Sequence, residues 1–232
     1  MRGSVLIALL SAACVHESVR GNGRTTRELR DLPRFDAVAV HSGIHAEVEI
    51  GPQAPVQVDA DENILPLVVT EVVDGTLSIR FRRDTDVSSE QAVRVRVRAP
   101  AVHRLEATGG AELRAQAEPG GDLEVRSSGG SEVRVRGLNA NRLSVSGSGG
   151  ARVQLAGAAD TVRLRISGGT RVRAASLAAR AVSVHGSGGA SAEIRASDVL
   201  RGSLSGGSTV HLIGRASSRV STSGGSSVDF DD

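Results

Sequence analysis

The stretch RISGGTRV, residues 165–172, places a pair of glycines between two short runs in which apolar and polar residues alternate. The same arrangement of Ser or Thr, two glycines and a small residue occurs seven times. The pairs are Gly109–Gly110, Gly129–Gly130, Gly149–Gly150, Gly168–Gly169, Gly188–Gly189, Gly206–Gly207 and Gly224–Gly225. Their spacing of 18 to 20 residues indicates stacked copies of one short structural unit.

The residues around each pair alternate with a period of two, which is typical of half-buried strands and not of helices. Examples are EVRVRG at 132–137 and TVRLRIS at 161–167. Glycine adopts positive φ without steric cost, so a Gly-Gly pair suits a sharp corner between two strands. The small residues beside it allow successive corners to approach closely and their hydroxyl groups to hydrogen-bond. Each unit is therefore predicted to be strand, corner, strand.

The predicted fold class is all-β: a right-handed parallel β-helix, or β-solenoid, with about 20 residues per coil over residues 101–232. The right hand follows from the crossover rule for parallel strands. One coil buries too few Val and Leu side chains to offset the entropy of ordering its backbone. The coils are therefore expected to be stable only when they stack.

Residues 32–100 contain five of the six prolines and no Gly-Gly pair. Alternating runs predict six strands in this segment, at 35–40, 46–50, 56–59, 67–73, 76–82 and 92–98. Asp74-Gly75 between two of these runs is a strong signal for a hairpin. We expect an irregular β-meander that caps the first coil and protects it from edge pairing.

Residues 1–14 have the features of a signal peptide: a basic Arg2, an apolar run of about 11 residues and small residues up to Cys14. The run is shorter than the roughly 20 residues that a membrane-spanning helix needs. Its end resembles a bacterial lipobox, in which Cys14 would be lipidated (for example with palmitate) and would anchor the chain in the membrane. Ser11 stands where a lipobox usually has Leu, so ordinary signal cleavage beside an incidental cysteine is the alternative. Residues 15–31 are polar and are predicted to form a tether.

The segment FDAVAVHSGIHAEVEIGPQAPVQVDADENILPLVVTEVVDGTLSIRF, residues 35–81, is followed by the Gly-Gly pairs. In this combination the chain resembles the head GIN domain of auto-transporter adhesins, over about residues 32–232. The resemblance implies a right-handed parallel β-helix on a bacterial secreted or lipid-anchored protein. It brings neither a catalytic motif nor binding residues, because the function of that family is unknown.

The composition argues against several kinds of function. The chain has no Trp or Tyr and a formal net charge of only +2, so nucleic-acid binding is not expected. Cys14 is the only cysteine, and the histidines lack metal-ligand spacing except for His41 and His45 on either side of Ser42-Gly43, which we attribute to chance. Neither a cofactor nor a metal site is predicted.

Parallel β-helices also carry polysaccharide lyases and hydrolases, so a glycan-active envelope enzyme is the alternative function. Such enzymes need clustered carboxyl groups. The nearest approach is one repeat position at which Glu112 and Glu132 are followed by Arg152 and Arg171, and a solvated face is the preferred interpretation. The serines lack the strand–turn–helix context of a nucleophile elbow.

Outward-facing arginines could form a basic strip that binds anionic glycan, lipopolysaccharide or phospholipid headgroups. The candidates are Arg134, Arg136, Arg163, Arg165, Arg171 and Arg173. A solubilising surface interspersed with Glu is the simpler interpretation of the same residues. The sequence therefore predicts a non-catalytic, exported module of the bacterial cell envelope, structural or adhesin-like, with an anionic glycan or an envelope protein as its candidate partner.

Overall fold

The computed structural model describes residues 17–117 and 120–231 of the chain. The predicted signal peptide and Cys14 lie outside the described residues. Within them the single helical element is the short 3-10 helix η1 (Leu65–Leu67), and no helix is long and apolar enough to cross a membrane. The strands are β1 (Glu17–Arg20), β2 (Thr25–Arg30), β3 (Ala37–Val40), β4 (His45–Ile50), β5 (Val56–Asp61), β6 (Val68–Val73), β7 (Thr76–Phe81), β8 (Thr85–Ser88), β9 (Arg94–Ala99), β10 (Arg104–Ala107), β11 (Glu112–Gln116), β12 (Leu123–Ser127), β13 (Glu132–Gly147), β14 (Arg152–Ile166), β15 (Arg171–Gly186), β16 (Ser191–Leu204), β17 (Thr209–Ile213), β18 (Ser217–Thr222) and β19 (Ser227–Asp231).

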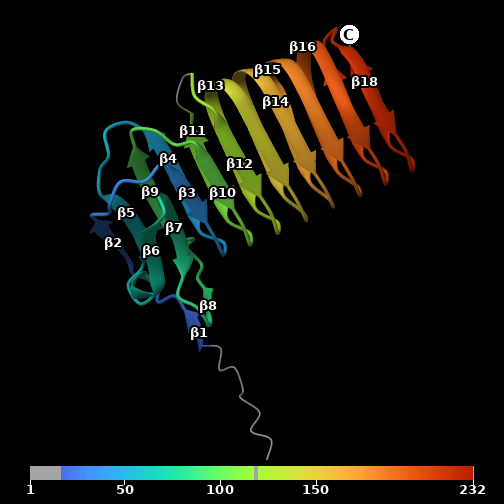
Figure 1. Cartoon of the computed structure of the whole chain (residues 1–232). Coiled ribbons are helices and arrows are strands. Elements are labelled where there is room, and N and C mark those ends of the chain that lie inside the picture. The colour runs from blue at the N-terminus through green and yellow to red at the C-terminus, as the bar shows by residue number, and fades with distance from the viewer. Residues whose placement is uncertain (1–16, 118–119, 232) are drawn as a thin grey trace, which may run out of the picture.

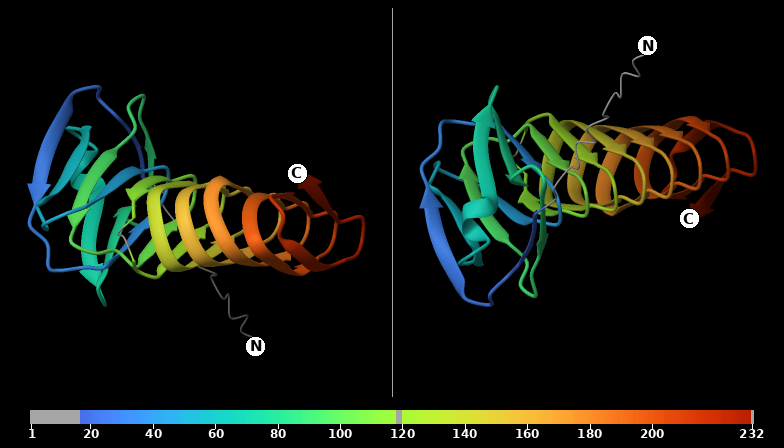
Figure 2. Two further views of the ribbon diagram at one scale, coloured as in Figure 1. Left: turned by 90° about the horizontal axis from the view of Figure 1, so that it is seen from above. Right: turned by 90° about the horizontal axis from the view of Figure 1, so that it is seen from below.

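Most of the chain winds into a solenoid, as predicted (Figures 1 and 2). The strand segments that lead into the corners form one sheet, which we call the pre-corner sheet. It runs in the order β7, β3, β10, β12, the second halves of β13 to β16, and β18. The segments that leave the corners form the post-corner sheet, in the order β9, β4, β11, the first halves of β13 to β16, β17 and β19. All pairings within these two sheets are parallel.

The core consists of columns of aliphatic side chains stacked along the solenoid axis. In one column Leu113 is followed by Val133, Val153 and Val172, each at most 1% exposed. The alternation of apolar and polar residues in the sequence determines which side chains enter these columns, because every second residue of a strand points to the same face. The columns become less buried toward the C-terminus, where Phe230 is 59% exposed.

The predicted meander precedes the Gly-Gly coils, but its strands do not stack in chain order. β3 and β4 join at Ser42–Gly43 and pair with β10 and β11, so residues 37–50 form a full coil of the solenoid. β7 and β9 come later in the sequence but lie before this coil, beneath β3 and β4. The boundary predicted at residue 100 therefore separates two parts of one solenoid.

Antiparallel strands close the N-terminal end of both sheets. β5 pairs with β9 and β2 pairs with β5, while β6 pairs with β7 through the predicted hairpin at Asp74–Gly75, both of which have positive φ. This cap covers edges that would otherwise offer unpaired backbone groups. The other end of the solenoid stops at β18 and β19.

The prediction of a tether at residues 15–31 is wrong for its described part. β1 pairs with β8, and β2 pairs with β5. Gly21 lies between β1 and β2 and packs closely on β5: a Cβ at this position would lie 1.8 Å from the buried Asp61 carboxylate. The segment is polar because β2 is an edge strand whose side chains are mostly exposed, so it needs no apolar alternation.

Candidate functional site

The seven glycine pairs line up along one edge of the solenoid. The first glycine of every pair has φ between +61° and +73°, a range that other residues rarely adopt. A Cβ on any of these glycines would lie 3.0 to 3.4 Å from the backbone of the first residue of the preceding corner. For Gly109 that residue is Ser42, itself at φ +58°. The first glycines thus form a continuous ladder, and Ser42–Gly43 begins it.

The second glycines fall into two groups. Those at 110, 130, 207 and 225 also have positive φ, whereas Gly150, Gly169 and Gly189 do not. The hydrogen bonds between corners change direction accordingly. Gly110 N donates to Gly129 O of the following coil at 3.1 Å, but Gly169 N donates to Gly149 O of the preceding coil at 2.7 Å. Positive φ is therefore found at the first position of every corner, where glycine stands in all seven pairs and Ser42 in the initial corner, but at only some second positions.

The hydroxyl groups that follow the pairs belong to the fold. Ser131, Thr170 and Ser208 are fully buried. Thr170 Oγ1 donates to Ser167 O at 2.7 Å, and Ser208 Oγ donates to Ser205 O at 2.9 Å, each across its own corner. Ser131 Oγ donates to Ala107 O of the preceding coil at 2.8 Å. These bonds satisfy buried polar groups and leave nothing free for a ligand.

The outward face of the post-corner sheet carries a network of ion pairs. Arg134 bridges Glu112 and Glu132, which are neighbours in register, with 2.8 Å between Arg134 Nη2 and Glu132 Oε1. Arg114 Nη2 lies 2.8 Å from Glu112 Oε1. Partial burial opposes ionisation of Glu112, but the hydrogen bond and charge of Arg114 and the charge of Arg134 outweigh it and lower its pKa.

These contacts make the Glu112–Glu132 pair a poor catalytic site. A general acid that cleaves glycosidic bonds needs a raised pKa, whereas Arg134 holds both carboxylates and the pKa of Glu112 is lowered. Across residues 17–117 and 120–231, no group of three or more His, Cys, Asp or Glu side chains could hold a metal ion. His41 and His45 have separate partners: His41 Nδ1 lies 2.7 Å from Thr108 Oγ1, and His45 Nδ1 lies 3.8 Å from Glu112 Oε2.

The structure divides the six arginines of the predicted strip between the two sheets. Arg134, Arg136, Arg171 and Arg173 lie on post-corner segments, and Arg163 and Arg165 lie on a pre-corner segment. The two sheets pack against each other through the core, so their outward faces point away from one another. The six side chains therefore do not form one strip, and Arg134 is already neutralised by Glu112 and Glu132.

A groove of about 490 Å³ crosses the pre-corner sheet beside the corners. Arg126 and Arg165 stand on either side of it, and Ser146, Gly147 and Ser148 lie between them. The hollow exists because the coil at 143–148 carries only serine or glycine at its outward and corner positions, between coils that carry arginine. The predicted strip did not anticipate this groove.

Comparison with known proteins assigns this architecture to a protein family. The family model described as "Putative auto-transporter adhesin, head GIN domain" matches residues 34–216. The chain belongs to the head GIN domain family. No curated protein matches it significantly in sequence.

Solved structures share the head GIN fold over nearly the whole chain. A "putative adhesin" from Bacteroides fragilis NCTC 9343 has a TM-score of 0.82 at 17% identity, covering 92% of this chain and 100% of its own. A "putative lipid binding protein" from Parabacteroides distasonis ATCC 8503 has a TM-score of 0.75 at 17% identity, covering 93% and 100%. A "putative adhesin" from Parabacteroides merdae ATCC 43184 has a TM-score of 0.71 at 20% identity, with the same coverage. At these identities the likeness concerns the fold.

Two features of this head GIN domain could have been found by aligning residues on the corners. The first is the corner at Ser42–Gly43, which the single glycine concealed. The second is the division of the arginines, because residues before a Gly-Gly pair and residues after it must lie on different sheets. Both follow from the repeat once its two strands are treated separately.

Proposed function

We propose that the chain is a non-catalytic, exported module of the bacterial cell envelope that is anchored through a lipid on Cys14 and binds in the manner of an adhesin. The observation that carries this proposal is the open solenoid itself, whose outward faces are long, regular and formed by exposed strand positions. Such a surface suits extended ligands, whereas small-molecule enzymes use enclosed pockets. Membership of the adhesin head-domain family supports the same conclusion.

The anchor and the fold are compatible in a specific way. Only Val15 and His16 separate Cys14 from the start of β1 at Glu17. Three residue steps span at most about 10 Å of extended chain. A lipid on Cys14 would therefore hold β1, and the cap with it, close to the membrane surface. Figure 1 places β1 at the lower margin of the cap and the last coil on the far upper side of the molecule.

Metabolic labelling tests the anchor. Cells that express the full chain are given an alkyne-labelled palmitate, and the protein is recovered and examined for label. We expect incorporation into the natural sequence and none into Cys14→Ser, which keeps the rest of the signal peptide unchanged. Equal labelling of both proteins, or none in either, would remove lipid anchoring from the proposal.

The catalytic alternative is tested by incubating the purified protein with uronate-containing, sulfated and neutral polysaccharides. We expect no change in chain length or reducing ends. Cleavage by the natural protein would contradict the proposal. Cleavage that persists in Glu112→Gln and Glu132→Gln would place the active site elsewhere on the solenoid.

A further inference from the structure

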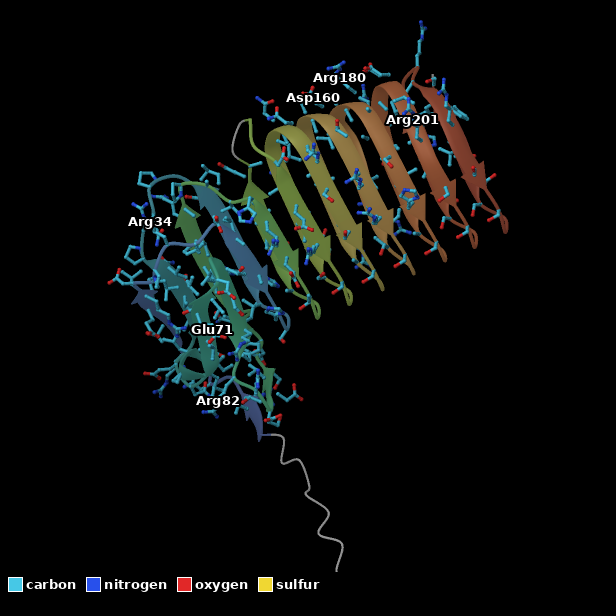
Figure 3. All side chains as sticks on the ribbon, viewed as in Figure 1. Arg34, Glu71, Arg82, Asp160, Arg180 and Arg201 are labelled. Atoms are coloured by element: carbon cyan, nitrogen blue, oxygen red, sulfur yellow. The ribbon has the colours of Figure 1, made fainter. Side chains whose placement is uncertain are left out.

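The outward surface of the pre-corner sheet changes character along the solenoid. Its last five segments, 143–148, 162–167, 182–187, 200–205 and 218–223, contain no Asp or Glu. We call their outward residues the arginine–serine face. They are Arg163, Arg165, His185, Arg201 and Arg219, together with Ser144, Ser146, Ser148, Ser167, Ser183, Ser187, Ser203, Ser205, Ser221 and Ser223. This sheet faces the viewer in Figures 1 and 3.

The positive charge of this face is not compensated. Arg163, Arg165 and Arg201 are exposed, and none has an ion-pair partner among the residues that the structure describes. The nearest carboxylates along the chain belong to Asp160 and Asp198, at the edge of the solenoid opposite the corners. Arg180 lies between them, 3.9 Å from Asp160 and 3.4 Å from Asp198. Figure 3 shows Asp160 and Arg180 on that edge.

The post-corner sheet differs in this respect. Glu112 and Glu132 hold Arg134, and Glu193 stands beside Arg173 in register. Carboxylates thus occur on the segments that begin at residues 112, 132 and 191 of that sheet, and the segments at 152–156 and 171–175 lie between them. An anion approaching the arginine–serine face meets guanidinium groups, hydroxyl groups and the His185 ring, and the one carboxylate that lines the groove, Glu106, lies two coils before Ser146.

Three hydroxyl groups of this face beside the corners are available to a ligand. Ser148, Ser167 and Ser187 precede three successive corners and line the 490 Å³ groove. Unlike the buried hydroxyls after the corners, their Oγ atoms make no hydrogen bond within the described part of the chain. Each hydroxyl can donate one hydrogen bond and accept two. Parallel stacking repeats them in a straight row at about 4.8 Å per coil.

We propose that the arginine–serine face binds a linear anionic polysaccharide, laid along the solenoid axis across successive coils. The guanidinium fork matches carboxylate, sulfate and phosphate groups in a bidentate manner. The rows of serine match the hydroxyl groups of the sugar rings. A polymer with regularly spaced charges suits a surface that repeats its own groups at a fixed interval. This inference rests on the proposed function, since such a ligand lies outside the cell.

Other extended anions fit this face less well. Single-stranded nucleic acid needs aromatic side chains for base stacking, and the five segments contain none. A membrane surface favours basic residues with apolar side chains that enter the bilayer. The apolar residues of these segments point inward, and Val162, Leu164, Val182 and Val184 are at most 3% exposed.

Binding of dextran sulfate and of neutral dextran of the same length, measured by isothermal titration calorimetry on the purified protein, tests the proposal. We expect dextran sulfate to bind and neutral dextran not to bind. The triple variant Arg163→Ser, Arg165→Ser, Arg201→Ser loses three exposed ion pairs with the sulfate groups of the ligand, so its Kd should rise about threefold to a hundredfold. The control Arg136→Ser, Arg152→Ser, Arg171→Ser removes the same charge from the other sheet, and its Kd should stay within about twofold.

Three results would overturn the proposal. Equal weakening by both triple variants would mean that only net charge matters, and equal binding of neutral dextran would remove the role of charge. Tighter binding to phosphatidylglycerol vesicles than to dextran sulfate, lost in the Arg163 triple variant, would reassign the face to a membrane. Far-UV circular dichroism verifies that both variants are folded. The labelling experiment tests the lipid anchor separately. Absence of the palmitate label would remove the anchor from the proposed function, and binding to dextran sulfate would still test the arginine–serine face.

Discussion

Substituting the two glycines of one corner separately should give opposite results. Gly168 has φ +63°, and a Cβ there would lie 3.0 Å from Gly149 O and 3.2 Å from Gly149 N. Gly169 lies outside the left-handed region, and a Cβ there would meet Gly149 O at 3.6 Å, an ordinary contact. Gly168→Ala is therefore expected to be damaging, and Gly169→Ala is its matched control one residue away.

The magnitude follows from two contributions. A left-handed conformation costs a residue with a Cβ about 1–2 kcal/mol. The close contact involves backbone that the neighbouring coils hold in place, and overpacking of this kind adds about 1–3 kcal/mol. Gly168→Ala should therefore lower the free energy of unfolding by about 2–5 kcal/mol. Gly169→Ala should leave it unchanged or raise it by about 0.4–1 kcal/mol, because alanine restricts the unfolded chain.

Urea unfolding measures the difference. The chain has no Trp or Tyr, so far-UV circular dichroism is the suitable signal. With an m-value of about 2–3 kcal/mol/M, the urea midpoint of Gly168→Ala should fall by about 1–2 M, while that of Gly169→Ala should not fall. Equal destabilisation by the two substitutions, or tolerance of both, would show that the first glycines do not form the ladder described here.

Two further predictions concern the cap and the ion pairs. Gly21→Ala should lower the free energy of unfolding by about 1–3 kcal/mol more than Gly121→Ala, because a methyl group at residue 21 would overlap the buried Asp61 carboxylate, whereas Gly121 has neither a positive φ nor a neighbouring atom within 4 Å; equal values in urea unfolding would indicate that the N-terminal segment does not pack on the cap. Arginine hydrogen bonds and charges outweigh partial burial and lower the pKa of Asp59, Glu112 and Glu124. Their ionised forms stabilise the fold at neutral pH, so stability should fall as the pH drops below their ordinary values of about 4. Glu112→Gln should reduce that fall in urea midpoints measured between pH 7 and pH 3, and an unchanged pH profile would contradict the assigned ion pairs.

The strands and corners could be predicted because their signals are local. A Gly-Gly pair specifies a corner, and alternation around it specifies which side chains enter the core. The six strands predicted between residues 32 and 100 also match β3 to β7 and β9 for the same reason. Edge strands lack that signal, so the polar segment TTRELR of β2 was predicted as part of a tether.

Other features depend on contacts between distant residues. Nothing near residues 76–99 indicates that β7 and β9 lie beneath β3 and β4, which precede them in the chain. The sequence indicates a turn at Ser42–Gly43 but not a corner of the solenoid, because Ser42 occupies, at φ +58°, the place where every later corner has glycine. The carboxylate-free surface emerges only when the residues before each corner are separated from those after it.

Disulfide formation between successive corners tests the stacked arrangement most directly. Ser187 N donates to Ile166 O at 3.0 Å, so Ser167 and Ser187 lie side by side on adjacent coils, about 4.8 Å apart. Disulfides need Cα atoms within about 7 Å. In a Cys14→Ser background, Ser167→Cys with Ser187→Cys should oxidise to an intramolecular disulfide without loss of structure. The pair Ser148→Cys with Ser187→Cys, two coils or about 9.6 Å apart, should remain reduced. Oxidation of both pairs, or of the distant pair alone, would contradict a solenoid whose coils advance by one corner every 18 to 20 residues.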